Sequence, residues 1–249
     1  MLAALSAIDV RTLVLLAAAA GVAGLARGFS GFGGALIFMP VASALVTPAV
    51  AAPVLLIADN VLAAGLLPWA WRRAGRREVA VMAMGAVLGV PLGTLALNHG
   101  DPLVLRWIIA ATAFAMLLLL MSGWRYAAAP RRPVTAGVGL LSGLFGGLAQ
   151  LSGPPVVAYW LSGRERAETV RANIILYFGA TSLLSTVSYL AAGLLTAKAL
   201  VLALIVGPAY GLGLFAGARV FGRASDAVFR RLCFTLIAVS VLSSLPLWG

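Results

Sequence analysis

Charged residues and helix breakers divide the chain into eight apolar stretches of roughly membrane-spanning length. They lie at about 10–45, 49–71, 79–98, 103–124, 134–162, 170–192, 198–221 and 228–248. Apolar residues make up 62% of the chain and charged residues only 10%, whereas soluble domains contain about 25% charged residues. The sequence therefore predicts an all-α polytopic membrane protein with about eight transmembrane segments.

Two glycine-rich segments interrupt this apolar sequence. The first stretch contains Gly28-Phe29-Ser30-Gly31-Phe32-Gly33-Gly34, and the fifth contains Gly143-Leu144-Phe145-Gly146-Gly147, 115 residues later. Opened backbone at membrane depth is tolerated where it lines a cavity or lies within protein. Two such breaks, each near the start of one half of the chain, are typical of secondary transporters built from internal repeats.

Other residues recur in the same order in the two halves, which indicates a duplicated unit of four apolar stretches. The matched sets are Gly28, Gly31, Leu36 and Pro40 with Gly143, Gly146, Leu151 and Pro155; Gly85 and Gly89 with Gly207 and Gly211; and Asp101 and Arg106 with Asp226 and Arg231. We predict an N-terminal repeat at 1–124, a cytoplasmic linker at 125–133 and a C-terminal repeat at 134–249.

The distribution of arginines favours halves of opposite orientation. Loop 72–77 carries four arginines and is expected in the cytoplasm, but simple alternation of eight spans would leave the arginines of 164–171 and 223–231 outside. If 134–162 enters and leaves on one face as a re-entrant hairpin, both groups move to the cytoplasm. We therefore favour an inverted repeat, with a parallel arrangement of eight spans as the alternative.

A glycine break can form an anion site without any basic side chain. The second arm of a broken helix exposes N–H groups at the positive end of its dipole. We expect these second arms to begin near Gly33-Gly34-Ala35 and near Ser152-Gly153-Pro154. The rival explanation is that the glycines only allow close packing between helices.

Polar residues in the predicted spans complete the candidate site. The candidate substrate-binding residues are Arg27, Ser30, Gly31, Gly33, Gly34, Asn60, Gln150, Ser152, Gly153, Asn173 and Tyr177. Asp59 is the candidate for proton coupling or for pairing with Arg27, with a purely structural salt bridge as the alternative. Asn173 and Tyr177 begin a four-residue repeat that continues with Thr181 and Ser185. This polar face suits a cavity wall or hydrogen bonding between helices.

The motif GFSGFGG followed by Pro40, its echo ending in Pro154-Pro155, and the layout of four plus four stretches resemble the sulfite exporter TauE/SafE family. The resemblance covers essentially the whole chain. It implies transport of sulfite, an organosulfonate or another sulfur-containing or organic anion across the bacterial inner membrane. The second copy has Leu148 and Ala149 in place of Gly33 and Gly34, so the two halves need not contribute equally.

We therefore expect a secondary transporter that moves a small anion by alternating access, with an anion channel or a non-transporting membrane scaffold as the alternatives. An enzyme is not expected, because one histidine, one cysteine and few acids leave no nucleophile–base pair or metal-ligand set. The net charge of +11 comes from loop arginines rather than from a nucleic-acid-binding stripe. We expect no cofactor. Beyond the anion and the lipid bilayer, coupled protons and a homodimer are left open as partners.

Overall fold

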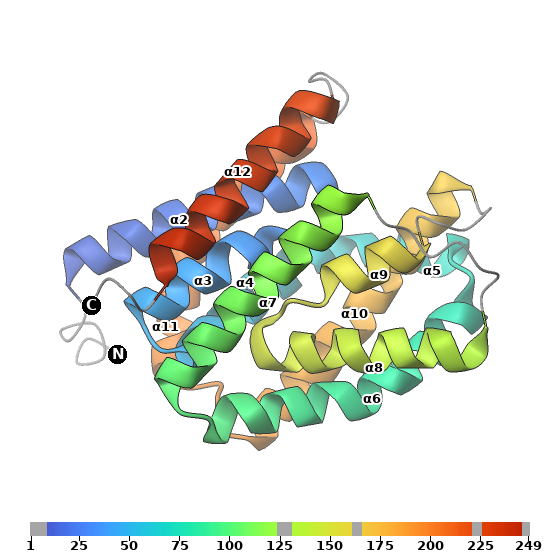
Figure 1. Cartoon of the computed structure of the whole chain (residues 1–249), viewed down its shortest axis with the longest axis horizontal. Helices are drawn as coiled ribbons and strands as arrows, with labels where there is room; N and C mark the ends of the chain where they lie inside the picture. The colour runs from blue at the N-terminus through green and yellow to red at the C-terminus, as the bar shows by residue number, and fades with distance from the viewer. Residues whose placement is uncertain (1–8, 124–130, 161–165, 221–225, 246–249) are drawn as a thin grey trace.

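The computed structural model describes residues 9–123, 131–160, 166–220 and 226–245, and its regular elements there are helices without any strand (Figure 1). They are α2 (Val10–Ser30), α3 (Gly34–Leu45), α4 (Pro48–Ala63), η1 (Ala64–Leu66), α5 (Leu67–Arg73), α6 (Arg76–His99), α7 (Pro102–Ser122), α8 (Arg132–Ala149), α9 (Gly153–Trp160), α10 (Ala167–Ala191), α11 (Ala197–Val220) and α12 (Asp226–Ser244). Most of the predicted linker at 125–133 lies outside the described residues.

Five of these helices are long and apolar enough to cross a bilayer, namely α2, α6, α7, α10 and α11. The pair α4 and α5 passes the same test as one span with a bend of 42°. Shorter apolar helices are α3 and residues 233–244 of α12. By length and composition, the described residues therefore contain five or six spanning helices, which confirms a polytopic α-helical membrane protein.

The first helix break lies within the predicted glycine segment. Helix α2 ends at Ser30 and is capped by Gly31, which has a φ of 78° and whose N–H donates to the carbonyl of Arg27 at 2.8 Å. Gly33, with a φ of 92°, then precedes the start of α3 at Gly34. A side chain at Gly34 would lie 3.0 Å from the carbonyl oxygen of Ala23 in α2. Helix α3 therefore folds back against α2, and its predicted starting point is confirmed.

The second break lies later than predicted. Helix α8 runs without interruption through Gly143–Gly147 to Ala149, and the break comes at 150–152, where Gln150 has a φ of 58°. The predicted break at Gly143–Gly147 is therefore wrong, because Gly143 and Gly147 face α6 and allow close packing within an unbroken helix. The predicted start of the second arm is confirmed, since α9 begins at Gly153.

Helices α8 and α9 form an antiparallel hairpin. The Ser142 hydroxyl donates to the carbonyl of Ser152 at 2.8 Å, and further from the break the hydroxyls of Thr135 and Tyr159 are hydrogen-bonded. The 18 residues of α8 span about 27 Å and the eight residues of α9 about 12 Å at the rise of an α-helix. The described part of α9 therefore returns only part of the way along α8.

Two seams of small residues each join a helix of the first half of the chain to a helix of the second half. A side chain at Gly24 or Gly28 of α2 would overlap the backbone of Tyr210 or Leu214 in α11. The contact points advance together along both helices, so α2 and α11 run parallel. Their backbones can approach this closely only because glycine has no Cβ.

The second seam joins α6 to α8 in the same way. Gly85 packs on the backbone of Ala136 and Gly93 on that of Leu144, so these two helices are also parallel. The predicted match of Gly85 and Gly89 with Gly207 and Gly211 is not the one that the contacts favour. A Cβ at Gly207 would meet no other atom of the described residues within 4 Å, whereas Gly213 and Gly217 make the close approach to α2.

The seams divide the helices into two groups. The first bundle consists of α2, α3, α4 and α11, and the second bundle of α6, α8, α9 and α10. The larger hydrophobic core lies mainly in the first bundle with α7 and α12, and a smaller core around Met82, Trp160 and Tyr177 lies in the second. Helices α7 and α12 pack against each other and against α3.

Arginines from distant loops gather at one end of the molecule. Arg73 forms an ion pair with Glu168, and Arg171 lies 6.0 Å from the ring of Trp69. The end of α5 and the start of α10 therefore lie side by side, as Figure 1 also shows. This places the arginines of 72–77 and 166–171 on the same side of the molecule.

Candidate functional site

A cavity of about 60 Å³ lies where the two helix breaks meet. Its wall includes Gly33 and Gly34 from the first break and Gln150, Ser152 and Gly153 from the second. One water molecule needs about 10–15 Å³. The cavity therefore has room for several waters or for one small anion, and the structure brings together the two segments that sequence analysis singled out.

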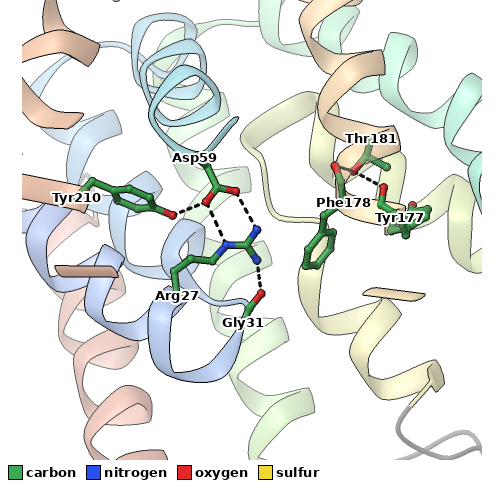
Figure 2. Close-up of polar contacts among 7 residues, drawn as sticks. All are labelled: Arg27, Gly31, Asp59, Tyr177, Phe178, Thr181 and Tyr210. Carbon is green, nitrogen blue, oxygen red and sulfur yellow. Dashed lines mark hydrogen bonds and ion pairs between the residues drawn. The ribbon is translucent and has the colours of Figure 1, made fainter. Parts of the chain in front are cut away.

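Arg27 and Asp59 form an ion pair in the wall of this cavity. Arg27 Nε donates to Asp59 Oδ1 at 3.1 Å, and Nη2 donates to Oδ2 at 2.9 Å (Figure 2). The side chains are only 15% and 22% exposed. A planar guanidinium thus binds both oxygens of a carboxylate in a largely solvent-excluded place. Pairing with Arg27, one of the two roles that the sequence left open for Asp59, is confirmed.

Three further groups hold the ion pair in position (Figure 2). The Tyr210 hydroxyl of α11 donates to Asp59 Oδ1 at 2.8 Å, and Arg27 Nη1 donates to the carbonyl of Gly31. The Arg27 guanidinium also lies 5.0 Å from the centre of the Phe178 ring in α10, a cation–π contact. Residues from α2, α4, α10 and α11 therefore fix this charged cluster from several sides.

The N-terminus of α3 opens into the same cavity. Gly34 and Ala35 line the cavity, and no side chain caps this end of the helix. The first N–H groups of a helix lack intrahelical acceptors and carry the positive end of its dipole. Helix α3 can therefore offer backbone donors to an anion next to Arg27.

The N-terminus of α9 is a poorer donor. The helix begins Gly153-Pro154-Pro155, and proline has no backbone N–H. Two of the donors that a helix N-terminus normally offers are thus missing. The sequence left open whether the two halves contribute equally, and the structure shows that the first tip has more backbone N–H groups than the second.

Hydrogen bonds brace the second break from within. Gln150 Nε2 donates to the carbonyl of Gly146 and to the Tyr189 hydroxyl, both at 3.1 Å. Tyr189 in turn donates to the carbonyl of Gly147 at 2.8 Å. Gln150 therefore lines the cavity while its amide N–H groups are already hydrogen-bonded at the C-terminal end of α8.

Asn173 and Tyr177 do not line this cavity. Asn173 Oδ1 accepts the backbone N–H of Gly75 at 2.7 Å, and the Tyr177 hydroxyl donates to the carbonyl of Gly139 at 3.3 Å. These are bonds between helices, the alternative that the sequence left open for this polar face. Thr181, one turn further along α10, is the member of the face that reaches the cavity wall.

Asn60 also points elsewhere. Its Nδ2 donates to the Thr186 hydroxyl of α10 at 3.2 Å, which ties α4 to α10 beside the cavity. The side chain of Ser30, another candidate, lies outside the described residues.

Sequence reasoning missed Tyr210 and Phe178, although both contact the ion pair. A hydroxyl in an otherwise apolar span was a usable signal for Tyr210, because such groups find a partner inside the membrane. Tyr210 lies 151 residues after Asp59, so sequence spacing could not identify the partner. Phe178 carried no comparable signal.

Comparisons with known proteins agree with this picture of a membrane protein. The sequence model of the family described as "Sulfite exporter TauE/SafE" matches residues 16–244. A relative from Cupriavidus necator, "Probable sulfite/organosulfonate exporter TauE", is 30% identical over 230 residues, covering 87% of this chain and 88% of the relative. No solved structure matches the chain.

Proposed function

Because the chain belongs to the sulfite exporter TauE/SafE family of membrane transporters, we propose that it is a secondary transporter for a small anion. The substrate is sulfite, an organosulfonate or a related organic anion, as the name of the Cupriavidus relative suggests. We place it in the bacterial inner membrane, where it would work by alternating access. The central observation is that both helix breaks and the Arg27–Asp59 pair line one cavity.

The anion would bind between the α3 tip and Arg27. Gly34, Ala35 and Arg27 all line the cavity. The first N–H groups of α3 and the guanidinium favour negative charge there. Gln150, Ser152 and Gly153 would close the opposite side of the site. Asp59 is the group that would couple anion movement to protons, because its carboxylate is bound to the same guanidinium.

The packing of the helices supports two inverted repeats, 1–124 and 134–249. The hairpin α2–α3 packs against α11 in the second half, and the hairpin α8–α9 packs against α6 in the first. An exchange of the two halves leaves this pattern of neighbours unchanged. The arginines of 72–77 and 166–171 lie at one end, as expected if α8–α9 is a re-entrant hairpin and that end is cytoplasmic.

The helix caps suggest how the two repeats align. Gly31 ends α2 and Gln150 ends α8, a separation of 119 residues. The seams agree, since Gly28 contacts α11 as Gly147 contacts α6. The sequence match of Gly28 with Gly143 is therefore one helical turn out of register with these structural positions.

In this proposal the two bundles are the moving parts of alternating access. Each bundle contains the hairpin and the following helix of one repeat together with a seam helix of the other. The close glycine contacts would keep each seam rigid, and the cavity lies where the first bundle meets the second. Rocking of one bundle against the other would open the cavity to each side in turn.

Counterflow in proteoliposomes tests the proposal. Vesicles loaded with unlabelled sulfite or methanesulfonate should accumulate the labelled anion transiently, and the rate should saturate with concentration. Single-channel current without counterflow would favour the channel alternative. No anion movement by protein of normal yield and thermal stability would favour a non-transporting scaffold. Size-exclusion chromatography with light scattering would separately test whether the protein is a monomer or a homodimer.

A further inference from the structure

Building on the proposed function, we propose that Asp59 is an internal counter-ion that occupies the substrate's place on Arg27. A proton on Asp59 would release the guanidinium to an oxyanion, so that one proton moves with each anion. Asp59 would then set both the charge balance of transport and the kind of anion accepted.

The geometry of the ion pair carries this inference. Both oxygens of Asp59 accept from Arg27, one from Nε and one from Nη2. This is also how a guanidinium binds a sulfonate or carboxylate guest. Arg27 is the one cation, and Asp59 the one acid, among the described residues that line the cavity. An anion that enters beside the ionised pair therefore meets a site with no net positive side-chain charge.

A proton on Asp59 is the simplest means of giving the cavity a net positive side-chain charge. The other groups that face Asp59 are Arg27 from α2 and Tyr210 from α11. The cavity walls from α3 and α10 contribute uncharged residues, among them Ala35, Phe178 and Thr181. Within the described residues, no second cation lies in this wall to compensate an entering anion.

The proposed cycle balances in protons and charge. A proton from water binds the Asp59 carboxylate, which becomes a neutral acid and binds the guanidinium less strongly. The oxyanion takes the vacated place on Arg27, and no bond in the substrate is broken. On the other side of the membrane the anion and the proton both leave, and the carboxylate returns to Arg27. For a monovalent anion, each cycle is electrically neutral.

The same geometry defines the class of guest. A guest that replaces a carboxylate on the Nε–Nη2 edge needs two terminal oxygens on one atom, a feature shared by sulfite, sulfonates and carboxylates. Chloride is a single atom and cannot give each of the two donors its own acceptor in this parallel geometry. We therefore expect at least about tenfold slower movement of chloride than of methanesulfonate, since two bent hydrogen bonds to one atom are weaker than two parallel charge-assisted ones.

Proton movement per anion is the quantity to measure. Methanesulfonate does not titrate near neutral pH, so proteoliposomes that contain a trapped pH-sensitive dye report only protons carried by the protein. The wild type should move one proton with each methanesulfonate, in the same direction. In Asp59→Asn the ratio should fall to near zero. The matched control is Glu168→Gln, which removes the acid of the exposed Arg73–Glu168 pair and should keep the wild-type ratio.

Tyr210→Phe provides a second test that does not remove either charge. Its hydroxyl donates to Asp59 and so favours the ionised carboxylate. Without this bond the pH profile of transport should shift in the alkaline direction at an unchanged proton ratio, because the variant removes a donor to the carboxylate and keeps both charged side chains.

Methanesulfonate movement without protons in the wild type, or chloride movement at an equal rate, would overturn this inference while leaving anion transport intact. If Asp59→Asn fails to insert into the membrane, an unshifted pH profile of transport in Tyr210→Phe would overturn the inference instead. Absence of exchange for sulfite and methanesulfonate alike would instead contradict the proposed function.

Discussion

The first helix break brings the Arg27–Asp59 ion pair to the cavity, with Tyr210 hydrogen-bonded to Asp59. The second break brings amide and hydroxyl groups. Both breaks follow a long helix, turn through a residue of positive φ and start a short helix beside the cavity. When the helix caps are aligned, Gly146 occupies the position that corresponds to Arg27. The two breaks therefore share a backbone design, and one of them carries the charge.

The two glycine seams, unlike the two breaks, are alike in the two halves of the chain. The α2–α11 and α6–α8 pairs are both parallel, and both depend on glycines that meet the partner's backbone. Packing has thus stayed alike in the two halves while the chemistry at the breaks has diverged. This difference is expected if the seams hold the bundles together and the breaks bind the substrate.

The largest predicted difference between the breaks is for Arg27→Ala against Gln150→Ala. Loss of Arg27 removes the two charge-assisted hydrogen bonds proposed for the anion, each worth about 1.5–3 kcal/mol. We expect at least about a 100-fold loss of counterflow, because each 1.4 kcal/mol is a factor of ten. Arg27→Lys should recover only part of it, since an ammonium cannot bind two oxygens side by side.

Gln150→Ala should reduce counterflow by about 2- to 10-fold, in line with a neutral hydrogen bond worth about 0.5–1.5 kcal/mol. Equal losses in the two variants at equal protein yield would show that the charge at the first break has no special role.

The second comparison is Gly33→Val against Gly153→Val. Gly33 has a φ of 92°, which a β-branched residue rarely adopts, so we expect loss of transport with membrane insertion retained. At Gly153 a Cβ would lie 3.3 Å from that of Phe32, a tight contact that a small shift relieves. Transport should therefore be reduced less. Counterflow normalised to the amount of inserted protein checks both, and normal transport in both variants would count against the helix tips as part of the site.

In the seams, Gly28→Leu and Gly147→Leu should have similar effects. Each side chain would overlap the backbone of the partner helix, at Leu214 and Val90 respectively. Overpacking costs about 1–3 kcal/mol, and more where backbone must move. We expect a lower melting temperature of the detergent-solubilised protein in both cases. A large drop in one and none in the other would contradict the equivalence of the seams.

The smallest predicted effect is for Tyr189→Phe at the second break. The change removes the hydroxyl that bonds Gly147 and Gln150 but keeps the ring in its buried place. We expect about 1 kcal/mol less stability and transport within a few-fold of the wild type. The measurements are thermal stability and counterflow. A loss as large as that of Arg27→Ala would mean that the second break contributes more to the site than its lack of charge suggests.

The sequence predicted the class of fold, the starts of α3 and α9 and the pairing of Arg27 with Asp59. These features depend on local signals, namely apolar length, glycine and proline positions, and the need of a buried charge for a partner. Glycine itself was ambiguous. At Gly31 and Gly33 it supplies a positive φ, whereas at Gly143 and Gly147 it allows close packing inside an unbroken helix. Only the position of the partner helix separates the two uses.

The rest of the site depends on contacts across the chain. Periodicity places Asn173, Tyr177 and Thr181 on one face of α10, but it does not say which neighbour each one meets. In the structure Asn173 meets Gly75 and Tyr177 meets Gly139, while Thr181 reaches the cavity. Tyr210 joins the ion pair because the α2–α11 seam brings α11 to the first break.

A disulfide between the two breaks tests the central claim most directly, since that claim is that the breaks meet at one cavity. A Cβ at Gly153 would lie 3.3 Å from the Cβ of Phe32, close to the distance that a disulfide spans. The variant Phe32→Cys/Gly153→Cys, with Cys233→Ser to remove the native thiol, should cross-link within one chain under mild oxidation. Transport should stop on oxidation and return on reduction. Two thiols that react freely with a small reagent but never cross-link would contradict the account.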